Sequence, residues 1–135
     1  MFFLLITRQV DYTLRIVRAL HRHGLQSAAA IAEREHMQKA ITLKLLKKLS
    51  AAGIVESRRG VNGGYLLTRS CDELTLLDLF CAAGEPPLLN RCQNPDYRCE
   101  NHPDRGCGLC REFCRIQTVL EAELSRTPLN AVFSG

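Results

Sequence analysis

Residues 54–68 read IVESRRGVNGGYLLT, and this stretch decides the fold. Two runs of β-prone residues, 54–58 and 65–68, flank a turn made largely of glycine and asparagine. These two residue types tolerate the positive φ angles of tight turns, which most other side chains avoid. The stretch therefore predicts a β-hairpin, and Arg58 and Arg59 place positive charge just before its tip.

Three helical patterns precede the hairpin. In residues 7–23 apolar side chains recur every three or four positions, and Gly24 follows as a stop. Ser27 can cap a short helix over 28–35, and a longer helix is predicted over 39–52. This order of elements, completed by the hairpin, predicts a winged helix-turn-helix. The predicted buried faces are Val10, Leu14, Val17 and Leu20, then Ala29, Ile31 and Ala32, then Ile41, Leu45, Leu46, Leu49 and Ala52.

The second half of the chain is also mainly helical. A helix is predicted over 74–83, and the sequence GEPP at 84–87 ends it. A narrow apolar stripe over 109–125 predicts a long helix that seals a helix–helix contact, either with a second subunit or with its own domain. We expect residues 126–135 to form a loose tail. The stripe consists of Leu109, Phe113, Ile116, Leu120 and Leu124.

Charge is distributed unevenly along the chain. Residues 1–69 hold twelve Arg and Lys against four acids, a net charge of +8, whereas residues 70–135 hold six Arg against ten acids, a net charge of −4. A lysine cluster alone is typical of a solvated helix face, but beside an arginine-bearing hairpin it indicates a polyanionic partner. All four lysines of the chain stand within ten residues: Lys39, Lys44, Lys47 and Lys48.

A winged helix-turn-helix reads double-stranded DNA with the N-terminal end of its second motif helix in the major groove. Gln38 and Thr42 are expected to reach base edges from this end. Lys39 and Lys44 are expected to reach bases or phosphates. The two arginines of the wing suit a minor groove, where negative potential favours arginine.

Residues 92–114 read CQNPDYRCENHPDRGCGLCREFC and hold five of the seven cysteines of the chain. Gaps of six, seven and two residues separate the first four of these cysteines. Zinc sites favour two close pairs, and a thioredoxin-type motif needs a βαβ context that the pattern lacks. Four thiolates on a flexible loop suit an iron–sulfur cluster. The candidate ligands are Cys92, Cys99, Cys107 and Cys110.

The remaining cysteines and the histidine of the loop are given structural roles. We expect Cys114 to pack or to remain a spare thiol, and Cys71 and Cys81 to be buried. His102 lies between two candidate ligands, but a single exposed loop histidine is more often solvated.

The N-terminal residues and the apolar runs of the chain predict its location in the cell. The N-terminal MFFLLITR lacks the basic start, the longer apolar run and the cleavage site of a signal peptide. The chain has no run of about 18 apolar residues, which a membrane-spanning helix needs. We therefore expect a cytoplasmic protein whose thiols stay reduced.

Four stretches carry a resemblance: TRQVDYTLR (7–15), SAAAIAEREHM (27–37), RGVNGGYLL (59–67) and LTLLDLFCAAGEP (74–86). Together they resemble the Rrf2 family of bacterial winged-helix regulators, which includes IscR and NsrR, and the wing is the most specific of the four. The likeness extends over about residues 5–133. It implies a homodimer held by the long C-terminal helix and a palindromic operator on double-stranded DNA.

The resemblance also implies a ligand set for the cluster. Cys92, Cys99 and Cys107 occupy the places of the three cysteine ligands. Cys110 stands where IscR-like members have a histidine, and Asp11 matches the aspartate with which the other subunit completes the site in NsrR-like members. We favour Cys110 because thiolate is the commoner ligand. The gaps between the cysteines are longer than in those relatives, so 2Fe–2S and 4Fe–4S clusters both stay open.

The family's DNA contacts carry over to the start of the recognition helix and to the wing. Ala40 lacks the hydroxyl that some relatives have at this place, so the operator is expected to differ from theirs. The implied contacts are Gln38, Lys39, Ala40 and Thr42 on the helix, and Ser57 and Arg59 on the wing.

The predicted fold class is mainly α with a small β-hairpin wing, a winged helix-turn-helix plus a long C-terminal dimerisation helix. We predict a homodimeric transcription regulator, acting as a repressor, whose operator affinity depends on a cluster that senses redox, nitric oxide or iron status. The predicted parts are a winged helix-turn-helix DNA-binding domain (1–70), a connecting helix and breaker (71–90), a cluster-binding loop (91–110), and the dimerisation helix with its tail (109–135).

Two other functions are weighed against this one. A thiol–disulfide or zinc switch could replace the cluster, and Arg98, Arg105 or Arg111 could lower the pKa of nearby thiols. A small iron–sulfur electron carrier is disfavoured because it needs neither the lysine cluster nor the arginine wing, and no catalytic constellation is visible.

Overall fold

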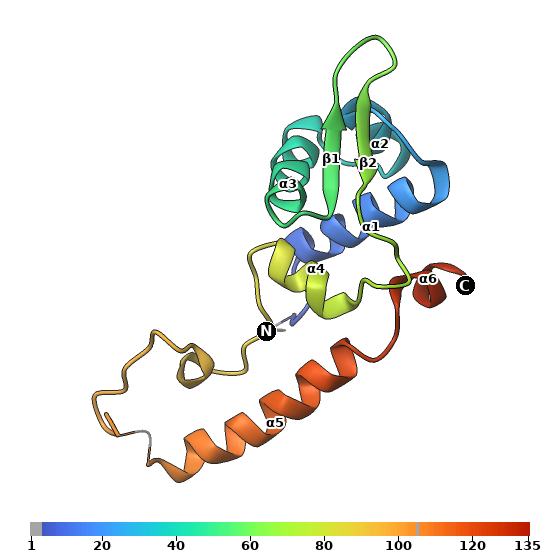
Figure 1. Cartoon of the computed structure of the whole chain (residues 1–135). Coiled ribbons are helices and arrows are strands. Elements are labelled where there is room, and N and C mark those ends of the chain that lie inside the picture. Colours follow the sequence, from blue (N-terminus) through green and yellow to red (C-terminus); the bar gives the residue numbers. More distant parts are fainter. Residues whose placement is uncertain (1–3, 105) are drawn as a thin grey trace.

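The winged-helix lobe and the long helix α5 form two distinct parts of the molecule (Figure 1). The computed structural model describes residues 4–104 and 106–135. A mainly helical chain with a two-stranded antiparallel hairpin confirms the predicted fold class. The elements are α1 (Arg8–His23), α2 (Ala28–Arg34), α3 (Lys39–Ala51), β1 (Val55–Arg58), β2 (Gly64–Leu67), α4 (Leu76–Ala82), the 3-10 turn η1 (Arg91–Gln93), α5 (Gly108–Leu124) and α6 (Leu129–Phe133).

The first two helices begin at side-chain caps. The Thr7 hydroxyl accepts a hydrogen bond from the Val10 amide at 3.3 Å, and the Ser27 hydroxyl accepts one from the Ala30 amide at 3.1 Å. These bonds satisfy amides that have no carbonyl partner within the helix. α1 ends at Gly24, whose φ of +67° favours glycine.

Two alanines predicted to be buried are exposed. In α2 the buried residues are Ala28, Ile31 and Ala32, whereas Ala29 faces solvent. The prediction for Ala29 was wrong because residues turn by about 100° each around a helix, which puts Ala29 roughly opposite Ile31. Ala52 is exposed because α3 ends one residue earlier.

Close backbone contacts explain the paired glycines of the wing. β1 and β2 pair antiparallel with Arg58 opposite Gly64. A Cβ on Gly63 would lie 2.2 Å from the Arg58 carbonyl oxygen, so glycine is needed to close the turn. A Cβ on Gly64 would lie 2.5 Å from the Gln26 carbonyl oxygen, which accepts a hydrogen bond from the Tyr65 amide at 2.7 Å. The second glycine therefore lets the hairpin dock onto the lobe.

One hydrophobic core joins α1, α2, α3 and the hairpin to α4 and α6. Because α4 and α6 contribute to it, the core extends beyond the boundary predicted at residue 70. Its buried members include Ile16, Val17, Leu20, Ile31, Leu45, Leu46, Leu49, Ile54, Val55, Cys71, Leu74, Leu79, Leu129 and Phe133.

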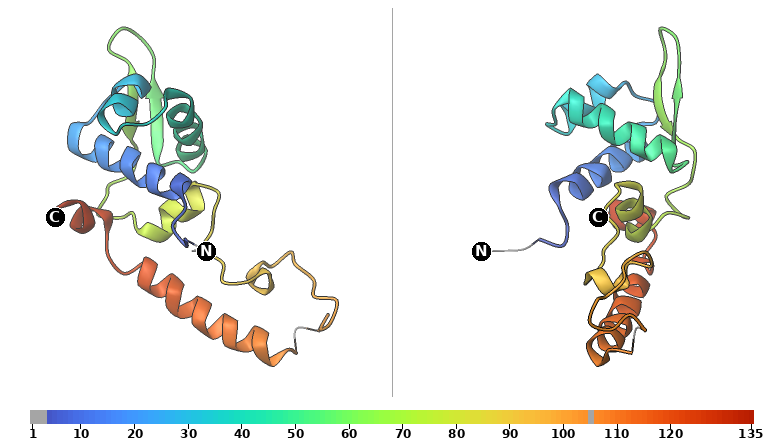
Figure 2. Two further views of the ribbon diagram at one scale, coloured as in Figure 1. Left: turned by 180° about the vertical axis from the view of Figure 1, so that it is seen from behind. Right: turned by 90° about the vertical axis from the view of Figure 1, so that its left-hand side faces the viewer.

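The C-terminal tail is packed rather than loose, which corrects the expectation for residues 126–135. Leu129 is fully buried, and its amide donates to the Leu74 carbonyl oxygen at 2.8 Å. Arg22 of α1 donates to the Phe133 carbonyl oxygen at 3.0 Å. The two buried apolar residues of α6, Leu129 and Phe133, are one helical turn apart. A single turn is too short to show a helical period in the sequence. Figure 2 shows the chain running back along α5 to the lobe, where α6 packs.

The apolar stripe of α5 is only partly covered in the single chain. The helix confirms the prediction over 109–125. Leu109 and Ile116 of the stripe are 66% and 38% exposed, whereas its other members are half-buried. Val119, beside the stripe, is 53% exposed. The buried residue of α5 is instead a polar one, Gln117. None of the helices in the described ranges has both the length and the apolar composition needed to cross a bilayer.

The packing of α6 predicts that its buried leucine is needed for stability. We expect Leu129→Ala to lower the free energy of unfolding by about 2–5 kcal/mol, because it leaves a cavity in the core. Urea unfolding followed by circular dichroism measures this change. The matched control is Val132→Ala, since Val132 is 43% exposed and its truncation should cost within about 0.5 kcal/mol. Equal effects of the two variants would contradict the packing of α6.

Candidate functional site

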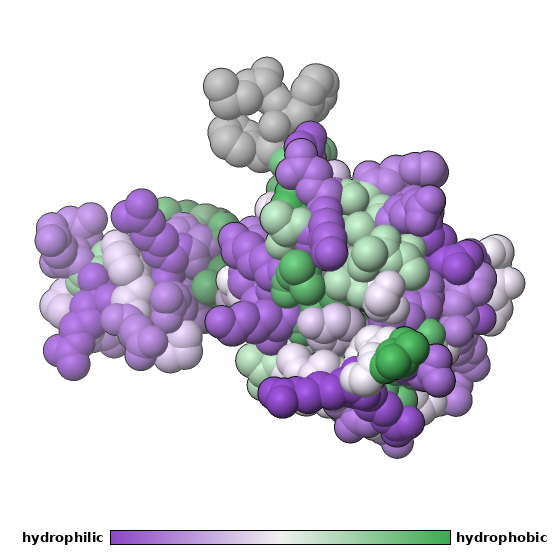
Figure 3. Space-filling view, turned by 90° about the horizontal axis from the view of Figure 1, so that it is seen from above, coloured by the Kyte–Doolittle hydropathy of each residue, from purple (hydrophilic) through white to green (hydrophobic). Residues whose placement is uncertain are grey.

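The N-terminal end of α3 presents a polar and basic surface. Gln38, Lys39, Ala40 and Lys44 are all exposed. Gln38 occupies the N-cap position without making a side-chain capping bond, so its amide is available to a ligand. Seen from the hairpin side, the winged-helix lobe is rimmed mainly by hydrophilic side chains (Figure 3).

Thr42 does not belong to this surface, which corrects its predicted role. Its side chain is fully buried, and its hydroxyl donates to the Gln38 carbonyl oxygen at 3.0 Å. The hydroxyl is satisfied within the helix and has no path to a base edge. Lys48 is also engaged inside the protein, since its ammonium donates to the Ala83 carbonyl oxygen at 2.8 Å.

The charged side chains of the wing are exposed to solvent. Ser57, Arg58 and Arg59 are exposed. The Arg58 guanidinium lies 3.4 Å from a Glu56 carboxylate oxygen, and both side chains are about half exposed, so this ion pair contributes little. The wing therefore offers two exposed guanidinium groups on the same lobe as the exposed end of α3.

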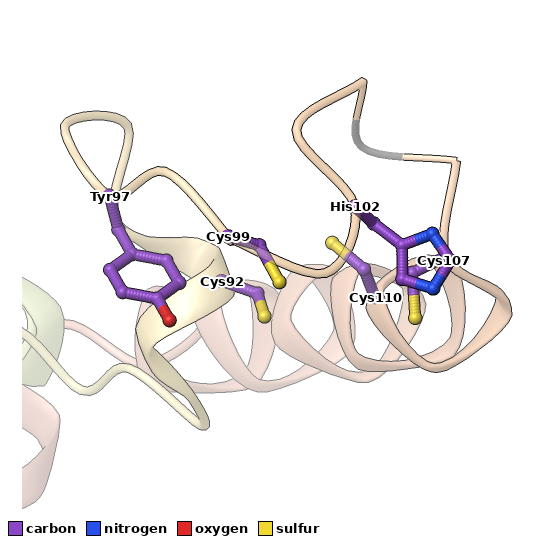
Figure 4. A pocket seen from close by; sticks show the side chains of 6 residues that line it. All are labelled: Cys92, Tyr97, Cys99, His102, Cys107 and Cys110. Atoms are coloured by element: carbon purple, nitrogen blue, oxygen red, sulfur yellow. The ribbon is translucent and has the colours of Figure 1, made fainter.

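The four candidate ligands line a single pocket. It lies between the loop and the first turn of α5, and its lining residues are Cys92, Tyr97, Cys99, His102, Cys107 and Cys110 (Figure 4). Local structure explains how the thiols meet. Cys92 sits in η1, Cys107 is the N-cap of α5, and Cys110 follows one turn later.

Figure 4 shows how these side chains are arranged. The sulfur atoms of Cys92 and Cys99 point into the same gap, and Cys110 faces them from α5. Cys107 and His102 lie toward the other end of the pocket. His102 is exposed as expected, yet it also lines the pocket, which the spacing alone did not predict. Tyr97 was missed because an aromatic residue in a polar loop gives no periodic signal.

The thiols differ in their electrostatic surroundings. Partial burial raises the pKa of the Cys110 thiol, and its contacts with the thiols of Cys114 and Cys92 raise it further. The expectation that loop arginines lower thiol pKa values therefore fails at Cys110, and Arg105 lies outside the described residues. Cys114 stands next to Cys110 but is exposed, as a spare thiol would be.

The geometry does not favour a preformed zinc site. Within residues 4–104 and 106–135, no three thiol, imidazole or carboxylate side chains converge closely enough to hold one metal ion. The ligands of a cluster are distributed over several iron atoms, so they stand further apart than the ligands of one ion. The lining of four thiols fits the soft donor set of an iron–sulfur cluster.

Asp11 lies on α1 and is absent from the pocket lining of its own chain. Its carboxylate pairs with Arg15 at 2.9 Å, and both side chains are 40% or more exposed. Within one chain the structure thus brings Cys110, and not Asp11, to the other three thiols.

The two isolated cysteines behave differently. Cys71 is buried as predicted, but Cys81 is exposed. The prediction for Cys81 was wrong because Leu79 and Phe80 provide the buried face of α4. Partial burial and the carboxylates of Asp78 and Glu121 raise the pKa of the Cys81 thiol.

The fold and the site define a winged-helix regulator with a cysteine loop before a projecting helix, and the comparisons with known proteins agree. The family model Rrf2, described as an iron-dependent transcriptional regulator, matches residues 6–135. The chain therefore belongs to the Rrf2 family, a family of transcription regulators rather than enzymes. This confirms the predicted family and fold.

Individual relatives are similar over part or all of the chain. Protein aau3 of Rhizobium meliloti is 34% identical over 89 residues, which cover 64% of this chain and 58% of that protein. IscR of Photorhabdus laumondii is 34% identical over 76 residues, which cover 56% of this chain and 46% of IscR. The chain thus spans about half the length of these curated relatives. The structure of CymR, the global cysteine regulator of B. subtilis, matches with a TM-score of 0.71 at 24% identity and covers 99% of this chain and 98% of CymR.

The exposure of the thiols predicts their order of reaction with iodoacetamide. Burial, followed by the charge of Asp72, raises the pKa of Cys71, so both access and thiolate fraction are reduced. We expect Cys114 to be alkylated while Cys71 stays intact, as followed by mass spectrometry of the native protein. Alkylation in denaturant, where both should react alike, is the control. Equal rates in the native protein would contradict the structure.

Proposed function

We propose that the chain is a homodimeric DNA-binding regulator, acting as a repressor, whose operator affinity depends on an iron–sulfur cluster held in the cysteine pocket. The observation that carries the proposal is the pocket lined by four thiols at the start of α5, a helix whose apolar stripe is partly exposed. The pocket thus adjoins the surface that would join two subunits. Membership of the Rrf2 family supports the DNA-binding half of the proposal.

DNA recognition would use the end of α3 and the wing. Gln38 and Ala40 would face base edges, and Lys39 and Lys44 would contact bases or phosphates. The wing, with Ser57, Arg58 and Arg59, would enter the adjacent minor groove. Thr42 is left out because it is buried.

A second copy of the chain would cover the apolar stripe of α5. Exposed apolar side chains at helical spacing are typical of a helix–helix interface. A dimer with two-fold symmetry would place two recognition helices on successive major grooves and so require a palindromic operator.

The pocket residues fit an iron–sulfur cluster. Cys92, Cys99, Cys107 and Cys110 would be its ligands, and Asp11 of the partner subunit is the alternative to Cys110. Four thiolates suit either a 2Fe–2S or a 4Fe–4S cluster. When bound, such a cluster supplies a group that oxidants, nitric oxide or iron shortage can alter. The residues of the loop would then hold one arrangement with the cluster and another without it.

A thiol switch is the second candidate, because Cys110 lines one pocket with Cys92 and the thiols of Cys92 and Cys114 raise its pKa. A two-electron oxidant of the peroxide class would join two of these thiols in a disulfide, with peroxide reduced to water. This candidate predicts that peroxide changes operator affinity in protein that contains no iron.

Substitution of the basic residues tests DNA binding. We expect Lys39→Ala and Arg59→Ala each to weaken binding to a duplex selected by the wild-type protein from a random-sequence pool. Each phosphate that a variant no longer neutralises should make the slope of log K against log salt shallower by about 0.9. Fluorescence anisotropy across a salt series measures both quantities. Arg126→Ala, which removes an exposed arginine just after the C-terminal end of α5, is the control and should change neither. Equal weakening in all three variants would contradict the assigned interface.

Replacement of single cysteines tests the ligand set. After anaerobic reconstitution, we expect Cys92→Ser and Cys110→Ser to lose bound iron and sulfide and the visible absorption that accompanies them. Cys114→Ser is the matched control and should retain all three. Loss of iron in Asp11→Ala together with retention in Cys110→Ser would identify Asp11, and not Cys110, as the fourth ligand of the cluster. Wild-type protein that stays colourless and free of iron would contradict the cluster.

A further inference from the structure

The segment between α4 and the cysteine pocket is held at both ends by side chains of other helices. We call residues 83–92 the strap; it is the yellow segment of Figure 1, and it ends at Cys92. One end meets the lobe at Ala83, and the other meets α5 at Gln117.

At the α5 end, a buried amide clamps the strap. Gln117 is only 6% exposed. Its Nε2 donates to the Pro87 carbonyl oxygen at 2.9 Å and to Glu121 at 2.8 Å, and its Oε1 accepts from the Leu89 amide at 3.0 Å. Breaking the clamp would leave buried polar groups unpaired, which is costly. Since Cys92 follows Leu89 by three residues, the clamp sets where the first thiol of the pocket lies relative to α5.

At the lobe end, the carbonyl of Ala83 is shared by two helices. It accepts from Lys48 of α3 at 2.8 Å and from Gln9 of α1 at 2.7 Å, and Ala83 itself is fully buried. The Thr7 hydroxyl also donates to the Glu85 carboxylate. The recognition helix is therefore bonded directly to the first residue of the strap.

The strap is suited to transmit a displacement. Pro86 and Pro87 have fixed φ angles, so the segment between the two anchors cannot absorb movement freely. α3 is one uninterrupted helix from Lys39 to Ala51, so Lys48 and the DNA-facing end of α3 move together over about 15 Å.

We propose that the strap couples the occupancy of the cysteine pocket to the position of the recognition helix, with Gln117 and Lys48 as the positioning residues at its two ends. The inference rests on the proposed function and adds the route by which the pocket reaches the DNA-binding surface. A change in the distance between Cys92 and Cys110 displaces the strap where Gln117 holds it. The strap passes this displacement on to Lys48.

Lys48→Met tests the route, because it keeps the length of the side chain and removes its bond to Ala83. The quantity measured is the coupling factor, the ratio of the Kd values for the selected duplex without and with anaerobically reconstituted iron and sulfide. We expect a wild-type factor that differs from 1 by about 5-fold or more. In Lys48→Met it should fall to within about 2-fold of 1, with iron content and circular dichroism unchanged.

The control is Lys47→Met, which removes the same charge from an exposed neighbour that does not bond the strap. It should change the Kd of both forms equally and leave the coupling factor at its wild-type value. A second pair tests the other anchor: Gln117→Leu should reduce the coupling factor, and Thr118→Val, an exposed neighbour, should not.

The outcomes separate the strap from the proposed function. A wild-type coupling factor in folded, iron-containing Lys48→Met would overturn the strap and leave the regulator intact, and so would a wild-type factor in Gln117→Leu. A factor of 1 in the wild-type protein, or no iron bound, would overturn the proposed function and the strap with it.

Discussion

The buried amide of Gln117 fixes the relation between the cysteine loop and α5. Gln117 is the fully buried residue of α5, and the apolar stripe of this helix is only partly covered by its own chain. A loop rich in Pro, Gly, Asn and Asp has no hydrophobic core of its own to hold it. The two bonds from Gln117 to the backbone at Pro87 and Leu89 therefore give the pocket its shape, because they bring Cys92 to the helix that carries Cys110.

In the rest of the molecule, buried residues of the lobe provide stability, and exposed residues are available for recognition. The core of the lobe is built from α1 to α4, the hairpin and α6, so it is complete within one chain. The residues proposed to contact DNA lie on the outside of this core and can vary without disturbing it. The exposed part of the α5 stripe, in contrast, has no cover in the single chain, and in the proposed dimer the pocket would lie between the lobe and the interface.

Much of this organisation could be predicted from local sequence patterns. Thr7, Ser27 and Gly24 mark helix ends, and the paired glycines mark the wing, because caps and turns depend on a few adjacent residues. The gathering of Cys92, Cys99, Cys107 and Cys110 could be inferred from loop composition and from family resemblance. The features that could not be predicted depend on long-range packing. The burial of Thr42 depends on how α3 packs against the other helices, which the local sequence does not reveal. α6 is too short to show a helical period. Nothing in the lysine cluster distinguishes Lys48, whose partner carbonyl lies 35 residues away.

If the pocket and the DNA surface influence each other, thermodynamic linkage makes this influence reciprocal. The most direct measurement is the equilibrium loss of cluster absorbance to a chelator, titrated anaerobically with and without the selected duplex. If the iron-loaded protein binds the duplex more tightly, we predict that the duplex protects the iron by the same factor; if the iron-free protein binds more tightly, the duplex promotes loss by that factor. A chelator titration that the duplex leaves unchanged, in protein whose DNA affinity does depend on iron, would contradict this coupling.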